Sequence, residues 1–354
     1  MNGYDLFIGV GSGEGDGGIF HYQFSPEEKM ISFVRCEDEF TRISYLTCHP
    51  NKRLACAVSE DGAVGLRTYW LHPDSGRLEK RGGFAPTANG LCHVSIAPEQ
   101  DRLFVSSYTE GQVCVYPLWP DGTVGKATGR VTQVGSSVNY ERQEGSHTHS
   151  VFPSVDGKVL VVCDLGADTL TVYRLKEDGD LERCQVWKAP PGSGPRHFEF
   201  HPNGKWGYLL TELSAEVTFF TIDANGVFHA RQTIPSLPEE FCGENLAAEI
   251  RLSANQRFLY VSNRGHNSVV WFSVASDGHL ERLGEIRTKG WPRELDFSWD
   301  GKFLFVLEER SKDTEGGVEA FPADIETGAL QPTGTYAALP NAQTFFCCES
   351  KELF

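Results

Sequence analysis

Short runs of alternating apolar and polar residues, separated by turn residues, dominate this chain. In residues 145–173, GSHTHSVFPSVDGKVLVVCDLGADTLTVY, two such runs and the start of a third surround an Asp-Gly turn at Asp156 and Gly157. A period of two is typical of β-strands with one buried face, and Asp-Gly favours a tight hairpin. Segments with a helical period are nearly absent, so the pattern predicts an all-β fold.

The same plan recurs along the chain. Each of the turns CHPNK, IAPEQD, FPSVDG, FHPNG, LSANQ and FSWDG follows a short apolar strand, and their aligned positions are Lys52, Asp101, Gly157, Gly204, Gln256 and Gly301. Successive positions lie between 45 and 56 residues apart. Repeats of this length with four alternating strands are characteristic of β-propeller blades.

The two ends of the chain supply a further blade. The N-terminal runs DLFIGV, IFHYQF and MISFVRC match the second, third and fourth strands of a blade that lacks its first strand, and AQTFFCC at 342–348 provides the missing one. Pairing of these segments would close the ring and remove its open strand edge. The sequence therefore predicts a single seven-bladed β-propeller domain over residues 1–354, with four antiparallel strands in each blade.

One glycine motif conflicts with this interpretation. Gly13, Gly15 and Gly18 satisfy G-x-G-x-x-G, but the strand IFHYQF follows them. Dinucleotide binding by that motif requires a helix whose N-terminus faces the pyrophosphate. We therefore interpret these glycines as part of a hairpin loop.

Charge restricts the partners that the protein can bind. The formal net charge is −16, whereas nucleic acids and anionic membranes require a basic surface. We expect neither as a partner. An anionic small molecule would need a local cluster of arginines inside the acidic shell.

Ten cysteines occur, many of them inside apolar runs such as LACAV and QVCVY, without any C-x-x-C pair. This pattern favours buried free thiols in a reducing cytosol. The N-terminus lacks the features of a signal peptide, and no run approaches the roughly 18 apolar residues that span a bilayer. We expect a cytoplasmic protein.

Blade geometry narrows the search for a site, because the start of the first strand and the end of the second face the same mouth of the central channel. The polar residues at strand starts are Arg42, His93, His147, His149, Arg196, Glu249 and Arg293; those at second-strand ends are Glu60, Tyr108, Asp164, Glu212, Asn263, Arg264 and Glu308. Each of them taken alone also has a structural explanation, since an inner-strand histidine can bond a neighbouring carbonyl and Arg–Glu pairs can join adjacent blades. Their convergence around one concavity is typical of a functional site.

The two histidines at the head of the fourth blade point to the same face of a strand. His147 and His149 have the spacing of a metal pair, but no third ligand of matching pattern stands out, so we expect no metal. A neutral histidine that accepts a proton from water is a better explanation of this pattern than a metal ligand. Since the chain also lacks a G-x-S-x-G elbow, we expect acid/base chemistry without a cofactor.

Longer strings carry a family likeness: RQEGSHTHSV, CDLGAD, GPRHFEFHPNGKWGYLLTELSAEVTFF, AEIRLSANQRFLYVSNRGHNSV and WPRELDFSWDGKFLFV. Together they resemble the seven-bladed lactonase family, which includes propeller-type 6-phosphogluconolactonases and the fungal 3-carboxy-cis,cis-muconate lactonizing enzyme. The resemblance implies that the catalytic groups are His149, Glu212, Arg196 and Arg264. From the other channel-mouth residues we select His93, Tyr108, His147, Asp164 and Arg293 as candidates for substrate binding.

These residue types suit an anionic sugar lactone. Arg196 and Arg264 would bind its anionic groups through charge-assisted hydrogen bonds of roughly 1.5–3 kcal/mol each. His149 or Glu212 would take the proton from the attacking water, and an arginine would stabilise the charge on the carbonyl oxygen. The leading hypothesis is a 6-phosphogluconolactonase; the alternatives are a carboxymuconate cyclase and a non-catalytic propeller that binds a partner.

The sequence departs from the family pattern at a few positions. Ser146 stands where proline is common, Glu294 stands where asparagine is usual, and the second blade contains an unusual loop in SEDGAVGLRTYWL. These departures affect the prediction of the substrate more than the prediction of the fold.

Overall fold

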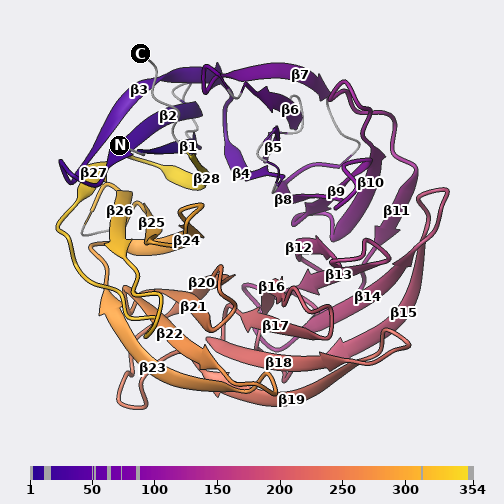
Figure 1. The fold of residues 1–354 in the computed structure, drawn as a ribbon. Coiled ribbons are helices and arrows are strands. Elements are labelled where there is room, and N and C mark those ends of the chain that lie inside the picture. Colours follow the sequence, from indigo (N-terminus) through magenta and orange to yellow (C-terminus); the bar gives the residue numbers. More distant parts are fainter. Residues whose placement is uncertain are drawn as a thin grey trace.

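The computed structural model is a ring of seven four-stranded antiparallel sheets around a central axis (Figure 1). It describes residues 3–11, 17–49, 51, 53–61, 65–72, 74–84, 88–311 and 314–349. Within these residues the named elements are 28 strands, and none of them is a helix. The predicted seven-bladed β-propeller is confirmed.

Each blade runs from an inner strand at the channel to an outer strand at the rim. Blade 1 contains β28 (Ala342–Glu349), β1 (Tyr4–Val10), β2 (Gly18–Ser25) and β3 (Met30–Glu39). Blade 2 contains β4 (Ile43–Cys48), β5 (Leu54–Ser59), β6 (Leu66–Leu71) and β7 (Leu78–Phe84). Blade 3 contains β8 (Leu91–Ile96), β9 (Arg102–Ser107), β10 (Gln112–Pro117) and β11 (Gly129–Thr132).

The other four blades repeat this order. Blade 4 contains β12 (Thr148–Pro153), β13 (Val159–Asp164), β14 (Thr169–Leu175) and β15 (Leu181–Lys188). Blade 5 contains β16 (Pro195–Phe200), β17 (Trp206–Thr211), β18 (Glu216–Ile222) and β19 (Phe228–Pro235). Blade 6 contains β20 (Leu246–Leu252), β21 (Phe258–Arg264), β22 (Ser268–Val274) and β23 (Leu280–Arg287), and blade 7 contains β24 (Trp291–Phe297), β25 (Phe303–Glu309), β26 (Gly317–Pro322) and β27 (Tyr336–Ala338).

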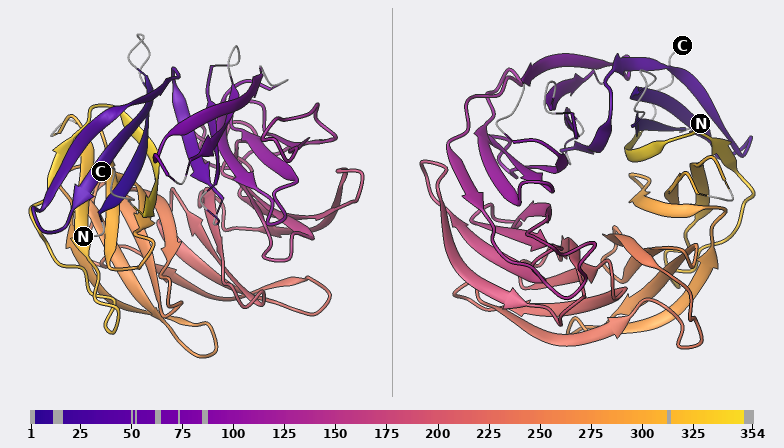
Figure 2. Two further views of the ribbon diagram at one scale, coloured as in Figure 1. Left: turned by 45° about the horizontal axis from the view of Figure 1, so that its top comes forward. Right: turned by 180° about the vertical axis from the view of Figure 1, so that it is seen from behind.

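The ring closes as the sequence predicts. Strand β28 pairs with β1 from Tyr4 opposite Glu349 to Val10 opposite Ala342. Figure 2 shows yellow β28 beside the indigo strands of blade 1 in both views. This pairing satisfies the backbone groups along an edge that would otherwise be open.

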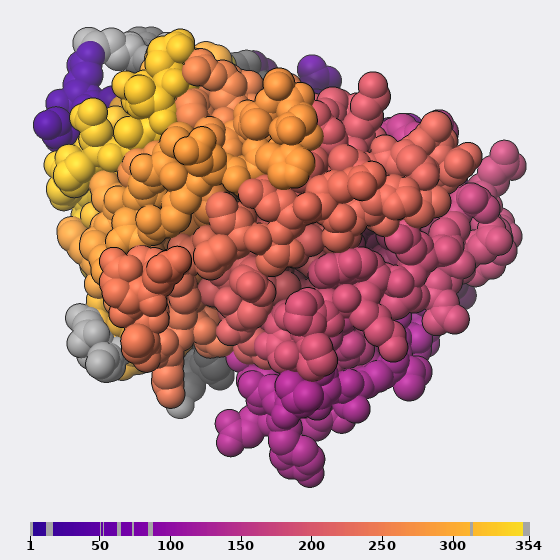
Figure 3. Space-filling view, turned by 90° about the horizontal axis from the view of Figure 1, so that it is seen from below, coloured from indigo at the N-terminus to yellow at the C-terminus, as the bar shows by residue number. Residues whose placement is uncertain are grey.

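The core is divided into seven hydrophobic clusters, and each one joins two neighbouring blades. Tyr208 and Phe219 of blade 5, for example, pack with Leu259 and Phe272 of blade 6. Burial of side chains of this size stabilises each interface by about 1.5–3 kcal/mol per residue. Figure 3 shows the resulting outer wall as a continuous surface whose colours follow the blades in sequence order.

The predicted turns are largely confirmed. Gly157, Gly204, Gln256 and Gly301 have positive φ angles of 68°, 67°, 62° and 71°, as tight turns with a left-handed residue require. In blade 3 the left-handed residue is Gln100, so our alignment at Asp101 was wrong by one position. Lys52, Gly13 and Gly15 lie outside the described residues, while Gly18 begins β2.

A β-bulge interrupts the inner strand of every blade at the same height. The pairing register skips Gln343, Ser44, Cys92, His149, Arg196, Ala248 with Glu249, and Arg293 in blades 1 to 7. A bulge leaves its extra residue unpaired and redirects its side chain. The fold therefore presents equivalent positions around one mouth of the channel.

All ten cysteines are free thiols. The prediction that they are buried is wrong for three exposed residues. Cys36 and Cys184 lie on the outer strands β3 and β15, and Cys242 lies in the connection between β19 and β20. In the described part of the chain, no helix has the length and apolar character needed to cross a membrane.

Candidate active site

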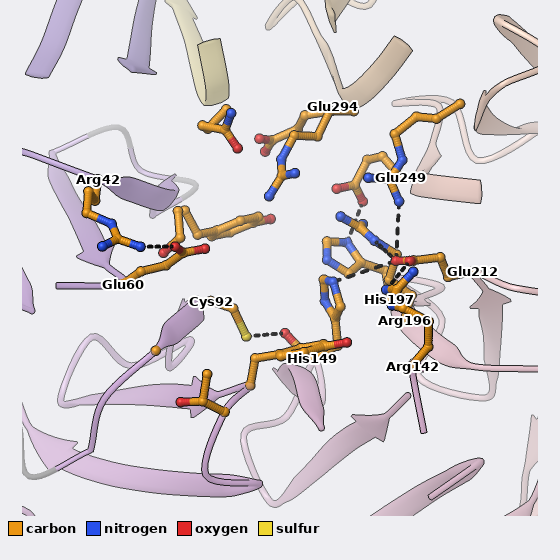
Figure 4. A pocket seen from close by; sticks show the side chains of 18 of the residues that line it. Arg42, Glu60, Cys92, Arg142, His149, Arg196, His197, Glu212, Glu249 and Glu294 are labelled. Atoms are coloured by element: carbon orange, nitrogen blue, oxygen red, sulfur yellow. Dashed lines mark hydrogen bonds and ion pairs between the residues drawn. The ribbon is translucent and has the colours of Figure 1, made fainter. Parts of the chain in front are cut away.

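A cavity of about 540 Å³ occupies the mouth of the channel to which the bulges point (Figure 4). Every blade contributes a skipped residue to its lining: Gln343, Ser44, Cys92, His149, Arg196, Glu249 and Arg293. Second-strand ends add Glu60, Tyr108, Glu212 and Arg264. Nine of the fourteen residues that the sequence places at strand starts and second-strand ends thus line the cavity; the five that do not are His93, His147, Asp164, Asn263 and Glu308.

Glu212 is the centre of the most charged part of the cavity. Its Oε1 lies 2.6 Å from Arg142 Nη2, and its Oε2 lies 3.0 Å from Arg196 Nε and 3.3 Å from Arg264 Nη2. The Glu212 side chain is only 3% exposed. Burial alone would raise its pKa, but Arg264, Arg196 and Arg142 together lower the pKa to about 2. Glu212 is therefore a fixed anion that orders three guanidinium groups.

A second carboxylate supports the arginines of blades 6 and 7. Glu309 lies 3.1 Å from Arg293 Nη1 and 3.6 Å from Arg264 Nη1. Arg264 also donates its Nε to the carbonyl of Leu246 at 3.2 Å. Burial lowers the pKa of Arg264 to about 10 despite Glu212, which still leaves it charged at neutral pH.

His149 lies beside this cluster. Its Nε2 is 3.9 Å from Glu212 Oε2, and its buried Nδ1 has no hydrogen-bond partner within the described ranges. Burial, followed by the nearby Arg196 and His197, lowers the pKa of His149 well below its usual value. The imidazole is consequently neutral at physiological pH and retains a free lone pair.

Beneath the bulges, the next inward-facing residues form the floor of the cavity. His197 Nδ1 is 2.9 Å from Glu249 Oε1, and the same oxygen is 2.8 Å from Arg251 Nη1. Arg251 Nη2 lies 3.4 Å from the Tyr45 hydroxyl and 3.8 Å from Glu294 Oε1. The floor is thus a polar network across blades 2, 5, 6 and 7.

The structure brings together six of the nine residues that we selected from the sequence. His149, Arg196, Glu212, Arg264, Tyr108 and Arg293 line the cavity, whereas His93, His147 and Asp164 are not among its lining residues. Tyr108 stands next to the charged cluster, where Arg142 hydrogen-bonds its side chain.

The three other residues support the site from behind. Asp164 is fully buried and accepts hydrogen bonds from the Ser146 hydroxyl and the backbone N–H groups of His147 and Ala167. Asp164 is the last residue of β13, one position before Leu165, which is the counterpart of Glu212 in blade 5. Because side chains alternate along a strand, Asp164 points away from the cavity. His147 stacks on the Tyr108 ring, with centroids 4.4 Å apart, and contacts the Tyr108 carbonyl through Nδ1 at 3.0 Å.

His93 belongs to the layer below the bulges. Its ring packs against Tyr45 at 4.3 Å and Phe152 at 4.6 Å between centroids, and the residue is 1% exposed. Burial lowers its pKa well below the usual value. These contacts make His93 a packing residue of the cavity floor.

The strand pattern did not reveal Arg142, Tyr45 or His197. Arg142 lies in the long connection between β11 and β12 and reaches the cavity only because that connection folds over blade 4. The one signal for it was its place in the string RQEGSHTHSV. Tyr45 and His197 follow directly after bulge residues, and strict alternation along the strand would place them on the face opposite to those residues.

No group of three or more His, Cys, Asp or Glu side chains suited to a metal ion occurs among residues that the structure describes. In the floor of the cavity, the guanidinium group of Arg251 is the cation that contacts the carboxyl groups of Glu249 and Glu294. The arrangement is therefore suited to binding an anion and transferring a proton.

The fold and this arginine-lined cavity define the class of protein. A family model described as lactonase, seven-bladed β-propeller, matches residues 5–347. The chain belongs to that family, and it is a hydrolase of the lactonase type.

Particular relatives agree with this assignment. The 6-phosphogluconolactonase of Bacillus subtilis (strain 168) is 30% identical over 344 residues, which cover 96% of this chain and 97% of the relative. The structure of the periplasmic gluconolactonase of Pseudomonas aeruginosa has a TM-score of 0.88 at 30% identity and covers 98% of this chain and 99% of that one. A protein from Lactobacillus plantarum has the same TM-score at 26% identity, with the same coverage.

Proposed function

We propose that this protein hydrolyses an anionic sugar lactone of the 6-phosphogluconolactone type in the cavity at the channel mouth. The observation that carries the proposal is the wall of arginines around Glu212. Four guanidinium groups, those of Arg142, Arg196, Arg264 and Arg293, are faced there by two carboxylates, Glu212 and Glu309, which leaves two positive charges unmatched. A phosphorylated sugar supplies a charge of nearly −2 at neutral pH.

The positive wall is local. The chain as a whole carries a formal charge of −16, so this cavity is the place where an anion gains favourable contacts. Charge-assisted hydrogen bonds to guanidinium groups are worth about 1.5–3 kcal/mol each. Two or three of them would hold the substrate in one orientation.

His149 is the better candidate for the general base. Glu212 has a pKa near 2 because three guanidinium groups surround it, and a carboxylate stabilised in this way is a weak base. His149 is neutral, lines the cavity and has one ring nitrogen without a hydrogen-bond partner among the described residues. The negative charge of a bound substrate would raise the pKa of His149 and improve its ability to accept a proton.

The chemical step follows from these positions. His149 takes a proton from water as the water oxygen attacks the lactone carbonyl carbon. The negative charge that develops on the carbonyl oxygen is stabilised by Arg196 or Arg264, which Glu212 holds in place without any change in conformation. The C–O bond of the ring then breaks to give the hydroxy acid.

The decisive assay is hydrolysis of freshly generated 6-phosphogluconolactone by the purified protein, with the spontaneous rate subtracted. We expect a clear acceleration, and a much larger kcat/KM than for unphosphorylated gluconolactone, because the latter lacks the dianion. Equal kcat/KM for both substrates would shift the proposal to a neutral gluconolactone. Lack of acceleration for either would contradict it.

The same preparation separates the alternatives. Loss of the conjugated diene of 3-carboxy-cis,cis-muconate, followed by ultraviolet absorbance, would identify a cyclase. A protein inactive toward all of these substrates would be a binding propeller. In the favoured case it acts between glucose-6-phosphate oxidation and 6-phosphogluconate, in the cytoplasm, and uses only its side chains and water.

A further inference from the structure

Glu294 occupies a distinctive place in the cavity. It follows the bulge residue Arg293 on β24, lines the cavity, and has a side chain that is only 3% exposed. Figure 4 shows its carboxyl group directed into the cavity from blade 7, with His149 on the far side. The residues after the bulge in blades 2 and 5 are Tyr45 and His197, and the two-residue bulge of blade 6 places Glu249 at the equivalent height; all three line the cavity.

The charged groups around Glu294 are two carboxyls and two cations, and each cation already binds another carboxylate. On the adjacent inner strands it is faced by Glu249 and Arg251 of β20 and by Thr344 of β28, and on its own strand Arg293 and Asp296 are close. Arg251 binds Glu249 at 2.8 Å but lies 3.8 Å from Glu294, and His197 also binds Glu249. Arg293 is held by Glu309 at 3.1 Å.

Glu249 is therefore the ionised member of the pair, and Glu294 has only the longer contact with Arg251, at 3.8 Å. Its Oε2 accepts a hydrogen bond from the backbone N–H of Phe345 at 3.3 Å, which is a neutral contact. A second carboxylate beside Glu249 in a buried site would be strongly unfavourable. Burial, and next the charge of Glu249, raise the pKa of Glu294 to about 8.

We propose that Glu294 is the general acid of this enzyme, donating a proton to the ring oxygen of the lactone as the C–O bond breaks. The inference rests on the proposed function and adds a second catalytic residue opposite His149. Acid and base on opposite sides of the cavity suit a ring opening, since one proton is removed from the attacking water and another is delivered to the ring oxygen that leaves the carbonyl carbon.

The step balances as follows. The water oxygen bonds to the carbonyl carbon while its proton passes to His149. The bond between that carbon and the ring oxygen then breaks, its electron pair stays on the ring oxygen, and the proton of Glu294 converts that oxygen to a hydroxyl group. His149 releases its proton to solvent, and Glu294 regains one from solvent through the open mouth of the cavity. The net reaction consumes one water and yields a hydroxy acid.

The test uses the full-length protein and its Glu294→Gln variant, which keeps the size and a hydrogen-bond donor but cannot transfer a proton. With 6-phosphogluconolactone, kcat of the unaltered protein should fall as pH rises through about 8, since Glu294 then loses its proton. Glu294→Gln should lower kcat at pH 7 at least tenfold, with a smaller change in KM, and should abolish that basic limb.

A matched control is Glu199→Gln. Burial raises the pKa of Glu199 to about 7, so it is a second protonated carboxyl on an inner strand, but it is not among the residues that line the cavity. This variant should retain kcat within about twofold and keep the basic limb. A loss as large as that of Glu294→Gln would indicate a general effect on the floor network and would overturn the proposal.

Infrared difference spectroscopy supplies a readout that does not depend on activity. The unaltered protein should show the carbonyl stretch of protonated carboxyls that titrate near pH 8. Burial also raises the pKa of Glu308 to about 8, so Glu294→Gln should weaken this band and leave the part that Glu308 contributes. An unchanged band in Glu294→Gln would overturn the inference. Should the variant not fold, the absence of that band from the unaltered protein above pH 7 would overturn the inference.

The two proposals fail differently. Lactone hydrolysis with an unchanged kcat and basic limb in Glu294→Gln would overturn the role of Glu294 and leave the proposed function intact. No hydrolysis by the unaltered protein would overturn both.

Discussion

The two sides of the cavity share a backbone but differ in chemistry. Blades 1 to 3 place Gln343, Ser44 and Cys92 at their bulges, whereas blades 4, 5 and 7 place His149, Arg196 and Arg293 there. The bulge is the same device in each case, since it directs one side chain per blade to the mouth. The propeller thus supplies equivalent positions, and the residues on one side decide where chemistry takes place.

The ion pairs on the two sides differ in burial as well. Arg196 and Glu212 are 4% and 3% exposed, whereas Arg42 and Glu60, on the side of blade 2, are 54% and 51% exposed. Exposed pairs are screened by water and contribute little, while buried charges retain strong fields. The charged wall of blades 4 to 7 should therefore dominate both catalysis and electrostatic stability.

The largest effect is expected for His149→Ala, since it removes the general base. The kcat should fall by about 10²–10⁴ with little change in the fold. Gln343→Ala, at the bulge of blade 1, is the matched control and should change kcat less than threefold. Similar losses of kcat in both variants would show that activity depends on an intact side chain at any bulge position and not on the chemistry of the histidine.

Glu212→Gln should have the next largest effect. It leaves Arg142, Arg196 and Arg264 without their shared anion, and we expect kcat/KM to fall by about 10²–10³. Activity close to that of the unaltered protein would mean that the arginines do not depend on Glu212 for their positions.

Glu212 also makes a prediction about stability. Its folded-state pKa is lowered from 4.5 to about 2, so its contribution is present above pH 4.5 and is lost as pH falls toward 2. That contribution is on the order of 3 kcal/mol. Urea unfolding at pH 6 and pH 3 should show a smaller acid-dependent loss in Glu212→Gln, while Glu60→Gln should change the free energy of unfolding by less than about 0.5 kcal/mol.

Arg293→Ala should have a moderate effect, mainly on binding. Removal of one guanidinium group from the substrate-facing wall should raise KM for 6-phosphogluconolactone about tenfold, which corresponds to one charge-assisted hydrogen bond. The increase should be smaller for unphosphorylated gluconolactone. An equal increase for both would mean that Arg293 does not bind the phosphate.

The smallest effect is expected for Arg42→Ala. Its exposed pair with Glu60 lies at the edge of the cavity, so KM should change less than about twofold at physiological ionic strength. A tenfold rise in KM would place the phosphate on the side of blade 2 and reverse the comparison.

Much of the fold could be predicted from the sequence because the strands of most blades are consecutive in the chain. The alternation of period two, the Asp-Gly turns and the repeat predicted the strands, and the apolar run AQTFFCC predicted the closing strand β28. The register error at Asp101 and the exposed cysteines arose where the pattern is weakest, in turns and on outer strands. The site was harder to predict. Asp164 is the last residue of β13, whereas Glu212 is the first residue after β17, and a difference of one position reverses the direction of a side chain.

The sequence by itself determined the number of blades, the closure of the ring and which end of each inner strand carries ionisable groups, because these depend on short-range periodicity. Only the tertiary structure decided which of those groups meet. The fold places Arg142, which lies in a loop, next to Glu212, and it places Asp164 and His147 behind the cavity, where they support it. It also places Glu294 beside Glu249, with too few cations nearby for both carboxyls. Burial and charge neighbours arise when blades are brought together, and they set the protonation state on which the chemistry depends.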